Sequence, residues 1–309
     1  MLLAGFDAGQ TTTRCRISRV VGDQLQLLAA GVGPGVSHLE EASGIERFQT
    51  AIRTSAAEAG PIGKVDAAVI GASGIERGTA LEERASQLMA RTLDLLPERA
   101  LATGDERTAL RGAFPDQAGI VAISGTGMIC VGRGDGGREH RCGGWGWRLD
   151  GAGSAFDLGH QGLQLSLRMA DGRLPDHPLR RELWNQLGCR SSADIKALVV
   201  RPDFGAAQFA ALAPAVVTAA EGGFEEAQRI IDQSADAQAE SIQSVAMALG
   251  ISHPQVVGQG GAFENLQPFR NAVKDALATR LPEAQWCQPL GDACDGALSL
   301  ARDLLIRPR

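Results

Sequence analysis

The chain has 309 residues, 44% of them hydrophobic and 21% charged, which is the balance of a globular protein that can bury a core. Its formal net charge of −6 argues against a nucleic-acid partner, because binding to a phosphate backbone requires a basic surface. No apolar run reaches the roughly 18 residues of a membrane span, so a membrane partner is not expected either.

The N-terminal segment contains no basic stretch and reaches Asp7 early, so it predicts a first β-strand instead of a secretory signal. The six cysteines form no CxxC pair, and the five histidines show no spacing typical of a metal site. We therefore expect a cytoplasmic protein with reduced, structural thiols.

The first part of the chain predicts strands followed by alternating helices and strands. Period-two alternation and short buried runs indicate the strands, and apolar residues at helical spacing indicate the helices. The predicted strands cover residues 2–6, 12–20, 25–31, 66–71 and 100–103. The predicted helices cover residues 43–59, 79–95 and 105–113.

After Pro115 the same order of elements begins again. Strands are predicted over 119–124, 128–133, 138–143, 255–258 and 285–289. Helices are predicted over 204–220, 224–249, 264–280 and 292–305, among other helical segments. The pattern indicates a duplicated α/β fold with lobes over 1–115 and 116–309 and a ligand cleft between them. The last helix is the element that could pack back on the first lobe.

Two glycine-containing turns are candidates for phosphate binding. In the first, Asp7 ends a strand and is followed by Gly9 and a cluster of threonines, a pattern that offers backbone N–H groups to phosphate and a carboxylate to Mg²⁺. Alone, it is equally a plain hairpin. The second turn, residues 124–127 (SGTG), lies between two apolar strands of the other half. Two such turns could hold a triphosphate from both sides.

A third glycine-rich segment, residues 257–263 (VGQGGAF), follows an apolar strand and precedes a helix. It is not the GxGxxG of dinucleotide-binding proteins, so it is either a shelf for adenosine or a simple strand–helix turn. Residues 143–147 (GGWGW) place two tryptophans close together, on one face if this segment is extended. Tryptophan rings suit the apolar faces of sugars, although a pair of core tryptophans would give the same pattern.

The three glycine-rich motifs resemble the two phosphate motifs and the adenosine motif of the actin-like ATPase and sugar kinase superfamily. Residues 143–147, followed by Gly153 and Ser154, resemble the N-acetylglucosamine kinase branch, which shares a family with the BadF/BadG/BcrA/BcrD-type ATPases. The resemblance covers essentially the whole chain. It implies a duplicated RNase H-like α/β fold with two lobes and an interdomain cleft, ATP and Mg²⁺ as cofactors, a small-molecule sugar substrate and a homodimer.

The resemblance also implies the roles of individual residues. Asp105 is the expected catalytic base, although an aspartate here is also a favoured helix N-cap, and its neighbour Glu106 suits the first helical turn. The implied nucleotide-binding residues are Asp7, which also holds the metal, Gly9, Gln10, Thr11, Thr12, Ser124, Gly125, Thr126, Gly127, Gly258, Gly260 and Gly261. The implied sugar-binding residues are Ser37, His38, Asp105, Thr126, Gly144, Trp145 and Asp150.

The chain departs from the resembling kinases at three places. Ala8 and Gln10 replace glycines, residues 150–154 are DGAGS in place of GDEGS, and Ser37 or His38 stands where asparagine is usual. We expect an ATP-dependent kinase that phosphorylates N-acetylglucosamine or glucosamine at the 6-hydroxyl. The alternatives are a kinase of another sugar, a BadF-type ATPase that acts on a protein partner, and a sugar-sensing protein with a decayed site.

Overall fold

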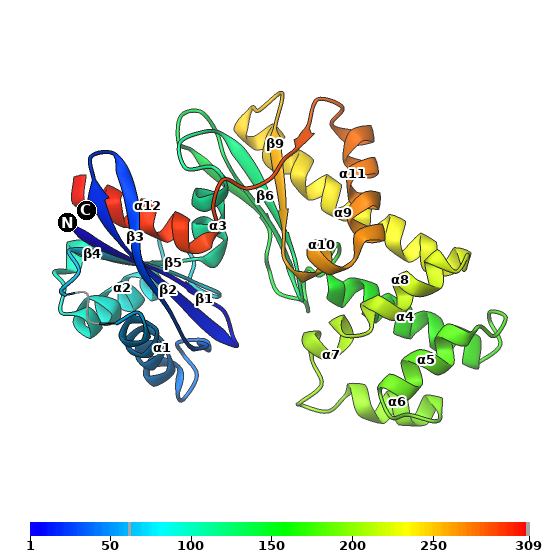
Figure 1. Ribbon diagram of the computed structural model, residues 1–309. Coiled ribbons are helices and arrows are strands. Elements are labelled where there is room, and N and C mark those ends of the chain that lie inside the picture. The colour runs from blue at the N-terminus through cyan, green and yellow to red at the C-terminus, as the bar shows by residue number, and fades with distance from the viewer. Residues whose placement is uncertain (61–62, 307–309) are drawn as a thin grey trace. The chain divides into compact units, whose positions relative to one another are not determined.

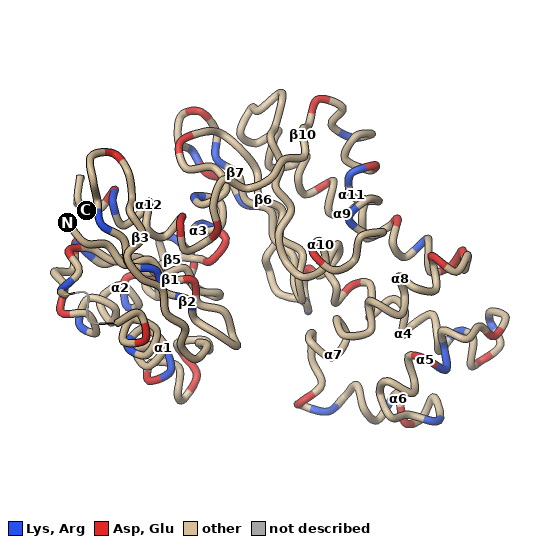
Figure 2. Tube along the Cα trace, in the orientation of Figure 1, with Lys and Arg blue, Asp and Glu red and all other residues tan. Residues whose placement is uncertain are grey.

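A computed structural model describes residues 1–60 and 63–306 (Figure 1). The chain divides into two compact units, which we describe separately. Unit 1 combines Met1–Gln117 with the chain from Gln288 onward, and unit 2 is Ala118–Cys287. Acidic and basic residues are interspersed along both units (Figure 2). None of the helices in the described residues has the length and apolarity needed to cross a bilayer.

Unit 1 is built on a five-stranded sheet with the strand order β3-β2-β1-β4-β5. Its strands are β1 (Leu2–Ala8), β2 (Thr12–Val21), β3 (Gln24–Pro34), β4 (Ala67–Ala72) and β5 (Ala100–Thr103). The first three strands form an antiparallel meander, whereas β4 and β5 run parallel to β1. The carboxyl ends of β1, β4 and β5 therefore meet at one edge of the sheet.

Helices cover both faces of this sheet because successive side chains of a strand point to opposite faces. On one face, Ala4 and Phe6 of β1 share a core with α1 (Gly44–Glu58) and α2 (Ala80–Leu93). On the other face, Leu3 of β1 packs with α12 (Ala293–Ile306). The C-terminal helix thus belongs to unit 1. The remaining helices of this unit are η1 (Pro97–Arg99) and α3 (Asp105–Ala113).

Unit 2 repeats the sheet topology of unit 1. Its strands are β6 (Gly119–Ser124), β7 (Met128–Arg133), β8 (Glu139–Gly143), β9 (Gln255–Gln259) and β10 (Gln285–Trp286). Their order, β10-β9-β6-β7-β8, is the order of the first sheet in reverse, with the same antiparallel meander and the same two parallel neighbours. The predicted α/β class and its duplication are therefore confirmed. The cleft between the lobes stays a prediction.

The helices of unit 2 share one continuous core with the second sheet, to which Ile120 of β6 and Ile242 of α9 belong; α4 to α9 follow β8, and α10 and α11 follow β9. These helices are α4 (Ala155–Ala170), α5 (Pro178–Gln186), α6 (Ser192–Val199), α7 (Ala206–Ala210), α8 (Ala213–Glu221), α9 (Glu225–Leu249), α10 (Gly261–Asn265) and α11 (Gln267–Arg280).

Three predicted elements are shorter or divided. The helix predicted over 204–220 is split into α7 and α8, and that over 264–280 into α10 and α11. Pro214 and Pro268 lie in the first turns of α8 and α11, and a proline lacks the N–H group that would bond to the carbonyl four residues earlier, so the preceding helix cannot continue through it. The strand predicted over 285–289 ends at Trp286, just before the chain passes into unit 1 at Gln288.

Candidate active site

In unit 1, the candidate residues gather at the edge where the parallel strands end. Asp7 lies near the carboxyl end of β1, and Asp105 follows β5 after a single intervening residue. The strands β1 and β4 are in register through Ala8 and Ala72, and β5 is in register with β4 through Thr103. Ligand sites of open α/β sheets lie at such carboxyl ends.

The first phosphate turn is closed by a hydrogen bond from the Gly9 amide to the Thr12 carbonyl at 2.9 Å. Residues 9–12 are exposed, so their amides and hydroxyls are open to a ligand. The turn also contacts the segment that follows β3, since the Gly35 amide donates to Thr11 at 3.0 Å. A Cβ on Gly35 would lie 2.2 Å from the carbonyl oxygen of Gln10, so only glycine permits this approach.

This contact brings Ser37 and His38 to the same edge of the sheet. The Oγ of Ser37 is buried and has no hydrogen-bond partner among the described residues. His38 Nδ1 accepts from the Glu40 amide at 3.4 Å. A Cβ on Gly74, which lies just after β4, would be 3.0 Å from the His38 ring. The loop after β3 therefore packs beside the end of β4.

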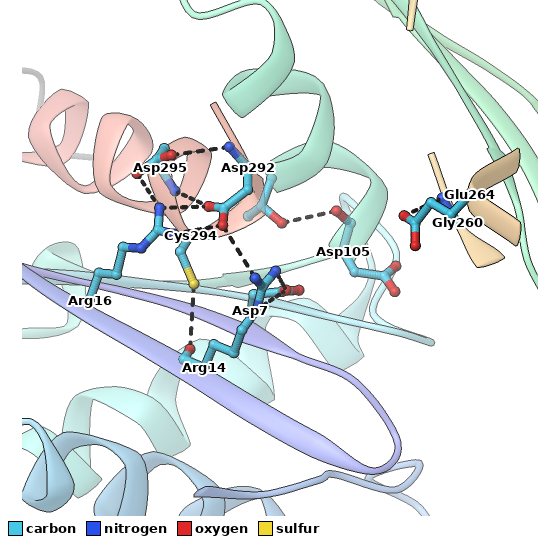
Figure 3. Close-up of polar contacts among 10 residues, drawn as sticks. Asp7, Arg14, Arg16, Asp105, Gly260, Glu264, Asp292, Cys294 and Asp295 are labelled. Carbon is cyan, nitrogen blue, oxygen red and sulfur yellow. Dashed lines mark hydrogen bonds and ion pairs between the residues drawn. The ribbon is translucent and has the colours of Figure 1, made fainter. Parts of the chain in front are cut away.

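The carboxylate of Asp7 forms an ion pair that sequence reasoning missed (Figure 3). Arg14, its partner across the β1–β2 pair, donates to Asp7 Oδ2 from Nη2 at 2.6 Å and from Nε at 3.2 Å. Arg14 also donates to Asp292, the residue before α12, at 3.3 Å. The hydrogen bond to Asp7 raises the pKa of Arg14. Both contacts on Asp7 use Oδ2, and the ion pair holds this carboxylate in a fixed orientation.

Asp105 is the first residue of α3, and its N-cap is Gly104. The alternative that Asp105 caps this helix is therefore wrong. Its Oδ1 accepts from the Glu106 amide at 3.1 Å. Burial raises the pKa of Asp105, and the negative charge of Asp7 raises this pKa further. The two carboxylates thus lie within electrostatic reach of each other in unit 1.

Glu106 is a second acidic side chain at this position. Its carboxylate folds back over Gly104, because a Cβ on that glycine would lie 2.1 Å from Glu106 Oε2. A side-chain hydrogen bond with Glu106 lowers the pKa of Asp105, against the larger effect of burial. The sequence suggested only a first-turn charge, and nothing in its spacing distinguishes that role from contact with Asp105.

In unit 2, the second phosphate turn and the adenosine segment lie against each other. The parallel strands β6 and β9 are in register through Ile123 and Gln259, so both segments emerge at one edge of the sheet. Gly260 has φ of 96°, and a Cβ there would lie 2.6 Å from the carbonyl oxygen of Ser124. Thr126 and Gly127 are exposed at the tip of the turn. The nucleotide residues implied for unit 2 are thus brought together.

Ser124 differs from its neighbours because its side chain is fully buried. Its hydroxyl donates to the carbonyl of Gly153 at 2.7 Å. The hydroxyl is therefore engaged within the protein, and the turn offers its backbone and the Thr126 side chain to a ligand.

The loop after β8 is a turn, because Gly143, Gly144 and Gly146 all have positive φ. The segment is therefore not extended, and the condition under which Trp145 and Trp147 would share a face is not met. Trp145 is 61% exposed, with the Arg141 guanidinium 4.7 Å from its ring centroid.

Trp147, in contrast, packs into the core of unit 2. Its ring centroid lies 5.2 Å from that of Phe156, on α4. The Asp150 amide donates to Gly146 at 2.8 Å, and its carboxylate lies beside Gly143, where a Cβ would be 3.3 Å from Asp150 Oδ2. Trp145 is therefore an exposed aromatic side chain of this loop, and the half-buried Asp150 carboxylate lies at its base.

Comparison with known proteins identifies the family. Residues 4–300 match the family model described as the BadF/BadG/BcrA/BcrD ATPase family. The chain belongs to this family. It is 26% identical over 302 residues to the N-acetylmuramic acid/N-acetylglucosamine kinase of Clostridium acetobutylicum, which covers 96% of this chain and 97% of that protein. It is 29% identical over 187 residues to the N-acetyl-D-glucosamine kinase of Dictyostelium discoideum, across 59% of each chain.

Solved structures of sugar kinases share the fold of this family member. A proposed N-acetylglucosamine kinase from Chromobacterium violaceum superposes with a TM-score of 0.73 at 28% identity, covering 97% of this chain and 98% of that one. A ROK family glucokinase from Streptomyces griseus, solved with glucose and AMPPNP, superposes with a TM-score of 0.60 at 17% identity, covering 98% of this chain and 100% of that one. At that identity the second likeness concerns the fold alone.

The residues present fit a nucleotide with a weakly ligated cation. The described residues contain no group of three or more His, Cys, Asp or Glu side chains that could hold a metal. Mg²⁺ needs no such group, because it keeps several waters and is commonly held by one or two carboxylates and the phosphates of its substrate. Asp7, with one carboxylate oxygen engaged by Arg14, suits this mode of binding.

Proposed function

We propose that this protein is an ATP-dependent kinase of an amino sugar, most specifically of the 6-hydroxyl of N-acetylglucosamine or glucosamine. The observation that carries the proposal is the placement of Asp105. Its partly buried carboxylate has a raised pKa and lies in the same unit as Asp7 and the exposed turn of residues 9–12. The Clostridium acetobutylicum kinase, similar along nearly the whole chain, supports the class of substrate.

The nucleotide would be held by groups from both sheets. The exposed first turn would bind phosphate oxygens through its amides and through Gln10, Thr11 and Thr12. Residues 125–127 would do the same from unit 2, and Gly258, Gly260 and Gly261 would form the adenosine shelf. Asp7 would hold Mg²⁺, which neutralises charge on the phosphates when bound.

Asp105 would act as the general base. Phosphoryl transfer needs little covalent help from the protein, so orientation of the accepting hydroxyl and acceptance of its proton are the main tasks of this carboxylate. A raised pKa brings the carboxylate closer to the operating pH, where a general base is most effective. The Glu106 amide, which donates to Asp105 Oδ1, fixes the direction of the carboxylate.

The sugar would contact side chains on both sheets. Ser37 offers a buried hydroxyl that lacks a partner among the described residues, and His38 lies beside it. Trp145 presents an exposed ring suited to a sugar face, with Gly144 and Asp150 as neighbours, and Thr126 completes the set. The implied homodimer stays a prediction, which sedimentation would test.

A panel of amino sugars and hexoses, assayed for ADP release from MgATP, tests this function. We expect turnover with an amino sugar and its loss in Asp105→Asn. ATP hydrolysis that is indifferent to every sugar would contradict the proposal and favour an ATPase that acts on a protein partner. The cysteines speak against an activator with an iron–sulfur cluster, because Cys15 and Cys294, for example, are buried and burial raises the pKa of each to about 12.

A further inference from the structure

Asp157, in the first turn of α4, accepts more hydrogen bonds than a helix cap requires. Its Oδ2 accepts from the Gly153 amide at 3.1 Å and from the Ser234 hydroxyl at 2.5 Å. Its Oδ1 accepts from the side-chain Nε2 of Gln161 at 2.9 Å. In return, the Asp157 amide donates to the hydroxyl of Ser154, the N-cap of α4, at 3.2 Å. One carboxylate therefore joins the end of the loop after β8 to α4 and α9.

The same stretch of backbone is joined to the second phosphate turn. The Ser124 hydroxyl donates to the Gly153 carbonyl at 2.7 Å, and the Ala155 amide donates to the Gly125 carbonyl at 2.8 Å. Gly153 has φ of 86°, and a Cβ there would lie 2.8 Å from the Oε1 of the buried Gln238. Residues 153–155 are thus enclosed between the turn on one side and α9 on the other.

Ser234 and Gln238 lie four residues apart on α9 and so on the same face of that helix. We define the loop brace as Ser124, Asp157 and Ser234 together with the backbone of residues 153–155. Every hydrogen bond of the brace lies within unit 2.

We propose that Asp157 is a positioning residue, which sets the register of the loop 143–154 against the phosphate turn 124–127 without touching either substrate. This inference rests on the proposed function, because it takes the loop as a sugar-binding element and the turn as a phosphate-binding one. A fixed register would keep the sugar hydroxyl and the transferred phosphoryl group in line, and such alignment contributes much of the rate in phosphoryl transfer.

The hydrogen bonds at position 157 require a side chain that accepts on both of its terminal atoms. Both oxygens of a carboxylate accept, and hydrogen bonds to an ionised acceptor are stronger than those between neutral groups. In Asp157→Asn one oxygen becomes an NH₂ group, which faces a donor and cannot accept from it. Either Gln161 or the pair of Gly153 and Ser234 then loses its acceptor.

The chain offers a matched control in α6. Asp194 occupies the equivalent position of its helix, since its amide donates to the N-cap Ser191 Oγ at 3.2 Å and its Oδ2 accepts from the backbone amides of Ser191 and Arg190, each at 2.9 Å. This cap is exposed on the surface. Asp194→Asn therefore disturbs a Ser–Asp helix cap without disturbing the brace.

The experiment compares Asp157→Asn and Ser234→Ala with Asp194→Asn and the wild type. We expect Asp157→Asn to lower kcat/KM for the sugar about ten- to a hundredfold, because small misplacements of reacting groups have effects of this size. Ser234→Ala removes one donor and should have a smaller effect in the same direction. Asp194→Asn should leave the kinetics unchanged and lower the melting temperature less than Asp157→Asn does, because its cap is exposed and its hydrogen bonds lie within residues 190–194.

Equal kinetics in Asp157→Asn and Asp194→Asn would overturn the inference. If Asp157→Asn does not fold, Ser234→Ala decides, and wild-type kcat/KM in that variant would overturn it. If the wild-type protein phosphorylates no sugar, the proposed function fails. The brace can still be tested, because amide hydrogen exchange over residues 151–155 measures it without an activity assay. Faster exchange there in Asp157→Asn than in Asp194→Asn supports the brace, and equal exchange overturns it.

Discussion

Arg14 faces Asp7 across the first two strands, and its guanidinium donates to one carboxylate oxygen from Nη2 at 2.6 Å and from Nε at 3.2 Å. A contact from Nη1 to Asp292 at 3.3 Å joins this pair to the start of α12. Because the Arg14 side chain is 50% exposed, the pair adds little stability, ~0–1 kcal/mol. Its main effect is on the direction of the Asp7 carboxylate.

Arg14→Ala should therefore impair nucleotide binding more than folding. We expect KM for MgATP to rise roughly tenfold, the effect of one lost charge-assisted hydrogen bond, with almost no change in melting temperature. Arg173→Ala is the control, because Arg173 donates to Asp171 from Nε and Nη2 in the same way on the exposed end of α4. A KM for MgATP equal to that of the control would show that Arg14 does not position Asp7.

Asp105→Asn should separate catalysis from binding. We expect kcat to fall about 10²- to 10⁴-fold, the usual contribution of a general base, because the amide cannot take the proton of the accepting hydroxyl. The Kd of a non-hydrolysable ATP analogue, measured by calorimetry, should stay within about twofold of the wild type, since binding and chemistry are separable. Near-normal turnover in this variant would remove Asp105 from the mechanism.

The same variant should be more stable than the wild type at neutral pH. Burial and the charge of Asp7 raise the pKa of Asp105, so the folded state holds this proton more tightly than the unfolded state does. The contribution of Asp105 to the stability of the wild type must then fall as pH rises from the unfolded pKa, about 3.9, through the raised folded pKa. Above the folded pKa the loss is complete and constant.

Denaturant unfolding of both proteins at a series of pH values measures this effect. We expect the free energy of unfolding of Asp105→Asn to exceed that of the wild type by an amount that grows across this window and then levels off. If the difference in the free energy of unfolding between the two proteins is independent of pH, then ionisation of Asp105 does not destabilise the folded state.

Local patterns predicted the positions of the motifs. Buried runs and alternation located the strands, so Asp7 and Asp105 were correctly expected at strand ends, and the repeated order of elements indicated the duplication. The helix is interrupted at Leu266, whose φ is −110° and ψ is 76°, and Pro268 explains this break, because it lacks the N–H group that would bond to the Glu264 carbonyl.

Tertiary partners could not be predicted in this way. Arg14 meets Asp292 across 278 residues, and Asp157 meets Ser234 across 77, and no local pattern joins such positions. Glu106 shows the same limit at short range. A glutamate is favoured in the first turn of any helix, so the sequence does not show that the Glu106 carboxylate lies beside Asp105 in the folded protein.

The two tryptophans of the loop after β8 should respond to substitution in opposite ways. Trp145 is 61% exposed, so Trp145→Ala should leave stability unchanged and raise KM for the sugar about three- to tenfold, the value of one ring stacked on an apolar sugar face. Trp147 packs 5.2 Å from Phe156, so Trp147→Ala should lower the free energy of unfolding by about 2–4 kcal/mol.

Steady-state kinetics and chemical denaturation of both variants measure the contrast. Trp145 is also the reporter of choice for binding, because sugar added to the wild type should change its fluorescence and sugar added to Trp145→Ala should not. If Trp145→Ala keeps the wild-type KM, the exposed ring lies outside the sugar site. The loop would then contribute only through Gly144 and Asp150, whose backbone and carboxylate remain at its base.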